Sequence, residues 1–93
     1  MKYILYWTPE AWRDVERLCM FLDEKSKNAA RELREELCLE PEILGTHPRI
    51  GQRMEKFQDR EIRRWIIGDY ELRYEIIEQK VVILRIWHGR EDR

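Results

Sequence analysis

The side chains best suited to chemistry are three arginines and a histidine in the last third of the sequence. Arg64, Arg73 and Arg85 lie in three segments rich in β-branched and aromatic residues, and His88 closes the last of these segments. Guanidinium groups bind phosphates and carboxylates, and histidine exchanges protons near neutral pH. The pattern indicates either a surface for an anionic partner or an anion site with a general acid–base beside it.

Three strands must position these side chains, and their turns set the register. Gly68-Asp69 is typical of a two-residue hairpin turn, and Glu78-Gln79-Lys80 is interpreted as a three-residue turn. We therefore predict an antiparallel meander of three strands, Ile62–Ile67, Tyr70–Ile77 and Val81–His88.

Side chains alternate between the two faces of a sheet, and directly opposite residues share a face. This register places Arg64, Arg73 and Arg85 side by side, a slightly unfavourable arrangement unless charge is compensated. Two explanations remain open: Glu71, Glu75 and solvent neutralise the row, or an anionic partner does. The opposite face is predicted to be apolar and covered by helices, with Trp65, Ile67, Tyr70, Leu72, Tyr74, Ile76, Val82, Leu84 and Ile86.

The residues after the last strand form a second candidate cluster. Gly89 allows the chain to turn, so that His88, Arg90 and Glu91 are expected to gather at the end of the sheet. His88 is either a hydrogen-bonded edge histidine or a general acid–base. Trp87 is predicted on the arginine face, where it could stack on a partner.

The first half of the chain should supply a strand and two helices. Lys2–Trp7 has strand composition, and Thr8-Pro9-Glu10 is a helix start with Thr as N-cap. Ser26 can cap a second helix, which Pro41 should end or kink before a loop at residues 46–51. The inner stripes are Ala11, Val15, Leu18 and Leu22, widened by Trp12 and Cys19, and then Ala30, Leu33 and Leu37. The expected fold is α+β in the order β-α-α-β-β-β, with two helices packed on one face of a small, mainly antiparallel sheet.

Composition sets limits on the function. Ninety-three residues make one domain, residues 1–93. The net charge is −1, but residues 48–93 hold eleven Lys/Arg against nine Asp/Glu, whereas residues 1–47 hold seven against ten. The sequence has no membrane-length apolar run, signal-peptide pattern, phosphate loop or metal-ligand spacing, so we expect a cytoplasmic protein without metal or cofactor.

In order and spacing, these features resemble the RelE/ParE family of type II toxin–antitoxin toxins across nearly the whole chain. The resemblance is carried by Ala11, Val15, Leu18, Phe21-Leu22, Ala29-Ala30, Leu44, residues 47–51, Ile62-Arg63-Arg64-Trp65, residues 70–74 and residues 82–91. It implies a toxin neutralised by a cognate protein antitoxin in a hetero-oligomer, with roles in growth inhibition and plasmid stabilisation. The antitoxin segment would order on binding and contact Arg64, Arg73, Arg85, Trp87, Arg90 and Glu91.

The family's targets leave three functions open. ParE-like members poison DNA gyrase, and the ending His88-Gly89-Arg90-Glu91 and the Trp65 strand resemble this side of the family. RelE-like members cleave ribosome-bound mRNA without a metal, and Arg64, Arg73, Arg85 and His88 would then be catalytic. Such ribonucleases commonly carry an arginine at the position of Glu71, which favours the ParE-like interpretation. A degenerate member that only binds its antitoxin is the third possibility.

Overall fold

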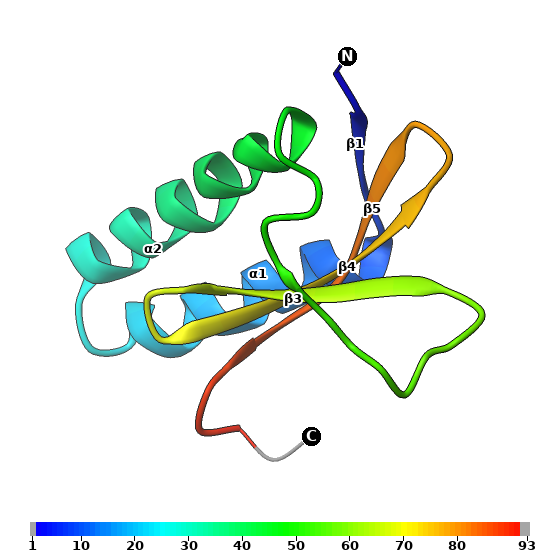
Figure 1. Ribbon diagram of the computed structural model, residues 1–93. Coiled ribbons are helices and arrows are strands. Elements are labelled where there is room, and N and C mark those ends of the chain that lie inside the picture. Colours follow the sequence, from blue (N-terminus) through cyan, green and yellow to red (C-terminus); the bar gives the residue numbers. More distant parts are fainter. Residues whose placement is uncertain (1, 92–93) are drawn as a thin grey trace.

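A computed structural model describes residues 2–91 and has two helices against one five-stranded sheet (Figure 1). The sheet order is β1-β5-β4-β3-β2, with β1 parallel to β5 and every other pair antiparallel. No helix in this described part has the length and apolar character needed to cross a membrane. The elements are β1 (Ile4–Trp7), α1 (Pro9–Asp23), α2 (Lys27–Leu39), a 3-10 helix (Glu40–Gly45), β2 (Gln52–Arg53), β3 (Glu61–Ile67), β4 (Tyr70–Ile77) and β5 (Lys80–His88).

The helices begin and end where the sequence predicts. The Thr8 hydroxyl accepts a hydrogen bond from the Ala11 amide, and the Ser26 hydroxyl accepts one from the Ala29 amide, so both N-caps are confirmed. Near Pro41 the chain changes from α-helix to a 3-10 turn, which keeps Leu44 in the core. This is the expected kinked continuation.

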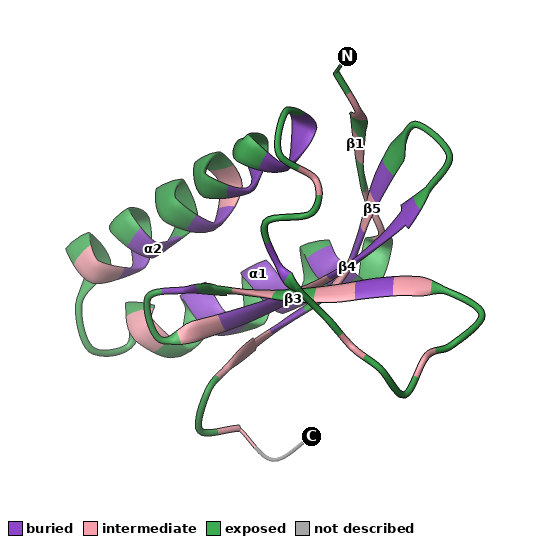
Figure 2. Cartoon of the chain, viewed as in Figure 1, coloured by how far each residue is buried: buried purple, intermediate pink, exposed green. Residues whose placement is uncertain are grey.

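The core lies between the α1–α2 hairpin and one face of the sheet, which we call the inner face. Buried residues line the sides of both helices that face the sheet (Figure 2). The predicted stripes are confirmed, except that Leu22 is half-buried and Trp12 is 43% exposed while stacking on Trp7. The inner face of the meander carries Trp65, Ile67, Tyr70, Leu72, Tyr74, Ile76, Val81, Ile83 and Ile86.

The predicted β4–β5 turn is wrong by one residue. Ile77 pairs with Lys80, so the turn has two residues, and Val81 and Ile83 face the core in place of Val82 and Leu84. A β-bulge at Leu84 then adds one residue to β5, and Arg73 again lies opposite Arg85. The turn is one residue shorter than predicted and the bulge adds one residue to β5. The two differences cancel, so the predicted register holds from Arg85 onward.

The short strand β2 was not predicted, and a buried tyrosine holds it in place. The hydroxyl of Tyr74 donates to the Pro48 carbonyl at 2.6 Å and accepts from the Gly51 amide at 3.0 Å. Gln52 then pairs with Arg64 at the edge of the sheet. The loop before β2 is thus anchored to the core by a side chain of β4.

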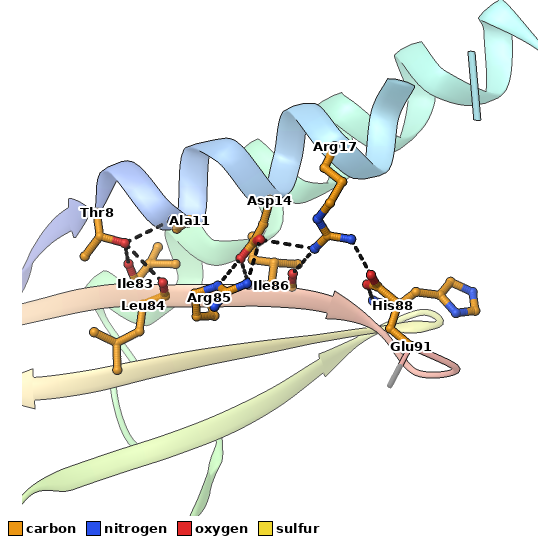
Figure 3. A network of polar contacts seen from close by, with 10 residues as sticks. All are labelled: Thr8, Ala11, Asp14, Arg17, Ile83, Leu84, Arg85, Ile86, His88 and Glu91. Carbon is orange, nitrogen blue, oxygen red and sulfur yellow. Dashed lines mark hydrogen bonds and ion pairs between the residues drawn. The ribbon is translucent and has the colours of Figure 1, made fainter. Parts of the chain in front are cut away.

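Side chains of α1 and its N-cap cover an open edge of β5. Strand β1 pairs with β5 only as far as Ile83, so the following backbone groups lack a neighbouring strand on that side. The Thr8 hydroxyl donates to the carbonyls of Ile83 and Leu84 at 2.8 and 3.1 Å. Asp14 accepts from the Ile86 amide at 2.9 Å, and Arg17 donates to the Ile86 carbonyl at 3.2 Å (Figure 3). These hydrogen bonds satisfy backbone carbonyl and amide groups of β5 that could otherwise pair with a strand of another chain.

The first residue of each hairpin turn has a positive φ, 58° at Gly68 and 54° at Glu78. Because that conformation costs a residue with a Cβ about 1 kcal/mol, Glu78→Gly should stabilise the protein slightly and Gly68→Ala should destabilise it by about 1 kcal/mol. Urea unfolding of the two variants measures both effects. A loss of stability in Glu78→Gly would contradict this account of the turn.

Candidate functional site

The arginine row forms as predicted on the outer face of the sheet, opposite the core, although its last member, Arg85, reaches α1 at the edge of the sheet. Arg64 of β3 lies opposite Arg73 of β4, which lies opposite Arg85 of β5. The next row on the same face contains Glu71 opposite Trp87. We call these five residues the arginine face.

Carboxylates within the chain compensate much of the charge of this row. Glu71 is 3% exposed and lies 3.6 Å from Arg64 and 3.5 Å from Arg73, measured between carboxylate oxygens and guanidinium nitrogens. Arg85 donates to Asp14 of α1 through Nε at 2.7 Å and Nη2 at 3.2 Å. The expected role of Glu71 as a neutralising residue is supported, whereas Glu75 instead pairs with Arg60.

Trp87 is an integral part of the arginine face. The guanidinium carbons of Arg73 and Arg85 lie 4.7 and 5.1 Å from the centre of its ring. Cation–π contacts of this kind hold both side chains and the half-buried ring in place. The result is a pre-ordered surface that presents aromatic and guanidinium groups together.

Asp14 connects the arginine face to α1 and was not predicted from the sequence. Its buried carboxylate accepts from Arg85, the Ile86 amide and Arg17 (Figure 3). Burial alone would raise the pKa of Asp14, but the hydrogen bonds from these donors outweigh it and hold that pKa below its ordinary value. Asp14 is therefore ionised at neutral pH and fixes the position of Arg85.

The predicted cluster at the end of β5 forms as a compact turn. The Glu91 carboxylate accepts from the His88 amide at 2.7 Å and from Arg17 of α1. The Arg90 amide donates to Nδ1 of His88 at 3.1 Å. The turn is thus tied to α1 through Arg17 and Glu91.

The structure separates His88 from the arginine face. His88 lies opposite Tyr70 and stacks edge-on against it, with ring centres 5.1 Å apart. Because faces alternate after Ile86, His88 points to the helix side, whereas Arg85 and Trp87 point to the outer face. The four residues proposed for ribonuclease catalysis therefore do not surround one position.

A pocket beside α1 contains residues that the sequence did not single out as functional. Arg17, Phe21 and Leu22 of α1 face Tyr70, His88 and the C-terminal turn across a volume of about 450 Å³. Side chains two residues apart in a strand point to the same face, so the burial of Ile86 also predicts His88 on the helix side of the sheet. This alternation could have located the pocket from the sequence. Within residues 2–91, no three His, Cys, Asp or Glu side chains are grouped as metal ligands.

Comparison with known proteins identifies the relatives of this chain. A family described as "ParE toxin of type II toxin-antitoxin system, parDE" matches residues 5–93. The chromosomal ParDE toxin–antitoxin system of P. aeruginosa has a chain of the same fold, with a TM-score of 0.77 and 14% identity over 94% of this chain and 96% of that one. The RelBE2 toxin–antitoxin complex of Mycobacterium tuberculosis has a chain with a TM-score of 0.60 and 25% identity, over 95% and 99% of the two chains. Among curated proteins, no sequence matches this chain.

Proposed function

We propose, starting from the fact that this chain belongs to the family of ParE toxins of type II toxin–antitoxin systems, that it arrests growth by poisoning DNA gyrase and is neutralised by a cognate protein antitoxin. Membership of the family and the shared fold support a toxin that has an antitoxin partner. The observation that favours gyrase over mRNA is the separation of His88 from the arginine face.

Cleavage of RNA without a metal needs a proton-transfer group and cationic groups around one phosphate. Here the His88 ring lies on the helix side of the sheet, and its Nδ1 accepts from the Arg90 amide. On the other side, Glu71 lies between Arg64 and Arg73 and adds a negative charge where a phosphate would bind. This arrangement favours protein contact over phosphoryl chemistry.

The arginine face has the composition of a protein-binding surface. Tryptophan and arginine are enriched among the residues that contribute most to binding at interfaces. Arg64 and Arg85 remain partly exposed on the same face of the sheet as Trp87, so they are available to carboxylates of a partner. We propose that this face, together with Arg90 and Glu91 of the C-terminal turn, contacts the antitoxin.

Induction of this chain alone should stop growth, and DNA synthesis should fall before protein synthesis. The physical reason is that trapped gyrase blocks replication while ribosomes continue on intact transcripts. Pulse labelling of DNA and protein measures the order, and purified protein should inhibit supercoiling by gyrase or trap cleaved DNA. Co-expression of the product of the adjacent gene should restore growth.

Cleavage of mRNA at defined positions in a translating extract, lost in His88→Ala, would overturn the gyrase proposal in favour of the ribonuclease. Normal growth on induction, with the protein present and folded, would instead indicate a member that only binds its antitoxin. His47→Ala is the matched control for His88→Ala because His47 is an exposed histidine in the loop before β2.

A further inference from the structure

The charges of the arginine face are almost balanced by carboxylates of the chain itself. Glu71 lies beside Arg64 and Arg73, at 3.6 and 3.5 Å, and its side chain is only 4% exposed. At the other end of the row, Asp14 pairs with Arg85 at 2.7 Å, and its side chain is also 4% exposed. Three guanidinium groups and two buried carboxylates leave this surface with a net charge of +1.

Two of the three arginine side chains still reach solvent. Those of Arg64 and Arg85 are 45% and 44% exposed, whereas that of Arg73 is 20% exposed. Arg64 and Arg85 lie at the two ends of the row, with Arg73 between them. The surface therefore offers two separate guanidinium groups, and each of them can bind one carboxylate of a partner.

Apolar side chains border the arginines on the same face of the sheet. Ile66 of β3 is 56% exposed and lies opposite Glu71, which in turn lies opposite Trp87. A protein partner can cover these apolar side chains and place a carboxylate on a neighbouring guanidinium group. A nucleic acid strand instead brings one negative charge with every nucleotide, and its binding depends on cations that neutralise several phosphates. The arginine face has too little net positive charge for that.

We infer that Glu71 determines the class of partner that the arginine face binds, so that the face accepts single carboxylates of a protein and excludes the phosphate chain of RNA or DNA. Glu71 contacts two of the three arginines from the central strand of the meander, and its burial limits screening by salt. Discrimination by an unfavourable charge is a common source of specificity at interfaces. The inference rests on the proposed function only for the identity of the protein partner.

Removal of the charge of Glu71 should create RNA binding. In Glu71→Gln, the affinity for a short fluorescent oligouridylate at low salt should rise at least about tenfold, because Arg64 and Arg73 become free to contact phosphates. Fluorescence anisotropy with the purified chain measures the affinity, and its logarithmic salt dependence should steepen by about 0.7 for each added phosphate contact. The double variant Glu71→Gln, Arg73→Gln should lose the gain. Equal RNA binding by Glu71→Gln and the unaltered chain would overturn the inference.

Glu75→Gln is the matched control for Glu71→Gln. Glu75 lies on the same strand and the same face, is 7% exposed, and pairs with Arg60 at 2.6 Å, outside the arginine row. The two substitutions change the net charge of the chain equally, and thermal unfolding confirms that both variants fold. Glu75→Gln should raise the affinity for RNA by less than about twofold. Equal gains in both variants would show that net charge, and not Glu71, controls the binding of RNA.

A surface variant tests the same point without altering a buried group. Ile66→Lys places an ammonium group opposite Glu71 at an exposed position, so the affinity for RNA should rise at least about threefold. Ile77→Lys is its control, because Ile77 is 42% exposed on the same face of β4 but lies beyond Glu75, away from the arginine row. It should change the affinity by less than about twofold. Equal effects of the two lysines would overturn the role of Glu71.

Competition by RNA connects this inference with the proposed function. Excess oligouridylate should leave binding of the adjacent gene's product by the unaltered chain unchanged and should weaken it in Glu71→Gln, and biolayer interferometry measures both. Equal competition in the two chains would overturn the inference. The direct RNA measurements need no partner, so their failure would remove the role of Glu71 and leave the proposed function standing. Failure of the unaltered chain to bind the adjacent gene's product or to stop growth would instead count against the proposed function alone.

Discussion

The Asp14→Ala variant is expected to lose about 2–3 kcal/mol of unfolding free energy, measured by urea denaturation at pH 7. The Asp14 side chain is 4% exposed, and its carboxylate accepts from Arg85, Arg17 and the Ile86 amide. Its removal leaves the Ile86 amide without a partner at the open edge of β5. The loss stays below that for a fully buried ion pair because the side chains of both arginines remain more than 40% exposed, so their guanidinium groups can be hydrated.

The pH dependence of this effect has a defined sign. The pKa of Asp14 is lowered by folding, so its carboxylate contributes stability that is complete above pH about 4 and is lost as pH falls through the folded-state value. The stability difference between the unaltered chain and Asp14→Asn should therefore narrow in that acidic range. A difference that is constant from pH 7 to pH 3 would contradict this assignment.

Asp23→Ala is the control for the same helix. Asp23 is exposed at the end of α1 and makes no ion pair among residues 2–91, so its removal should change the stability by less than about 0.5 kcal/mol. Asp14→Ala and Asp23→Ala remove the same charge from the same element. An equal effect of both would show that only the net charge matters.

The Gly51→Ala variant is expected to lose about 3 kcal/mol of unfolding free energy or to fail to fold. A Cβ at this position would lie 2.7 Å from the Arg64 carbonyl oxygen and 2.7 Å from the Tyr74 hydroxyl. Neither atom can move away easily, because one belongs to the backbone of β3 and the other to a fully buried side chain. The methyl group would push the loop out and break both hydrogen bonds of the Tyr74 hydroxyl.

Gly45→Ala is the matched control because Gly45 is also buried and has no positive φ. There the nearest atoms to an added Cβ are 3.4 Å away, which is ordinary contact, so the loss should be below about 1 kcal/mol. Thermal unfolding followed by tryptophan fluorescence measures both variants. Similar losses in the two would rule out a steric role for Gly51.

The three-strand meander and the arginine row could be predicted because both depend on local rules. Alternation and turn length placed Arg64, Arg73 and Arg85 together, although the turn after Ile77 was one residue too long. Leu84 offset that error, and nothing in the local sequence marks it as a bulge. The bulge is set by how β5 must twist to bring both Ile83 and Ile86 into the core.

The partners of the site residues were harder to predict because they come from distant parts of the chain. Asp14 contacts Arg85 across 71 residues, and Arg17 contacts Glu91 across 74. Their positions on α1 are on the border of the apolar stripe, where a charged residue normally faces water. Asp14 and Arg17 can bond to β5 only because α1 packs directly over the edge of that strand. No single segment of the sequence specifies that packing.

The placement of β5 has a consequence for the order in which the sheet can form. Strand β5 lies between β1 and β4, and its Val81, Ile83 and Ile86 are fully buried at the centre of the core. Its parallel pairing with β1 joins segments about eighty residues apart, so this contact closes a very long loop and folding should be slow for the size of the chain. During synthesis the four earlier strands are made before β5, so β1 has no neighbouring strand until β5 follows. A nascent chain that lacks β5 therefore cannot form the complete native sheet, although β2, β3 and β4 can already pair.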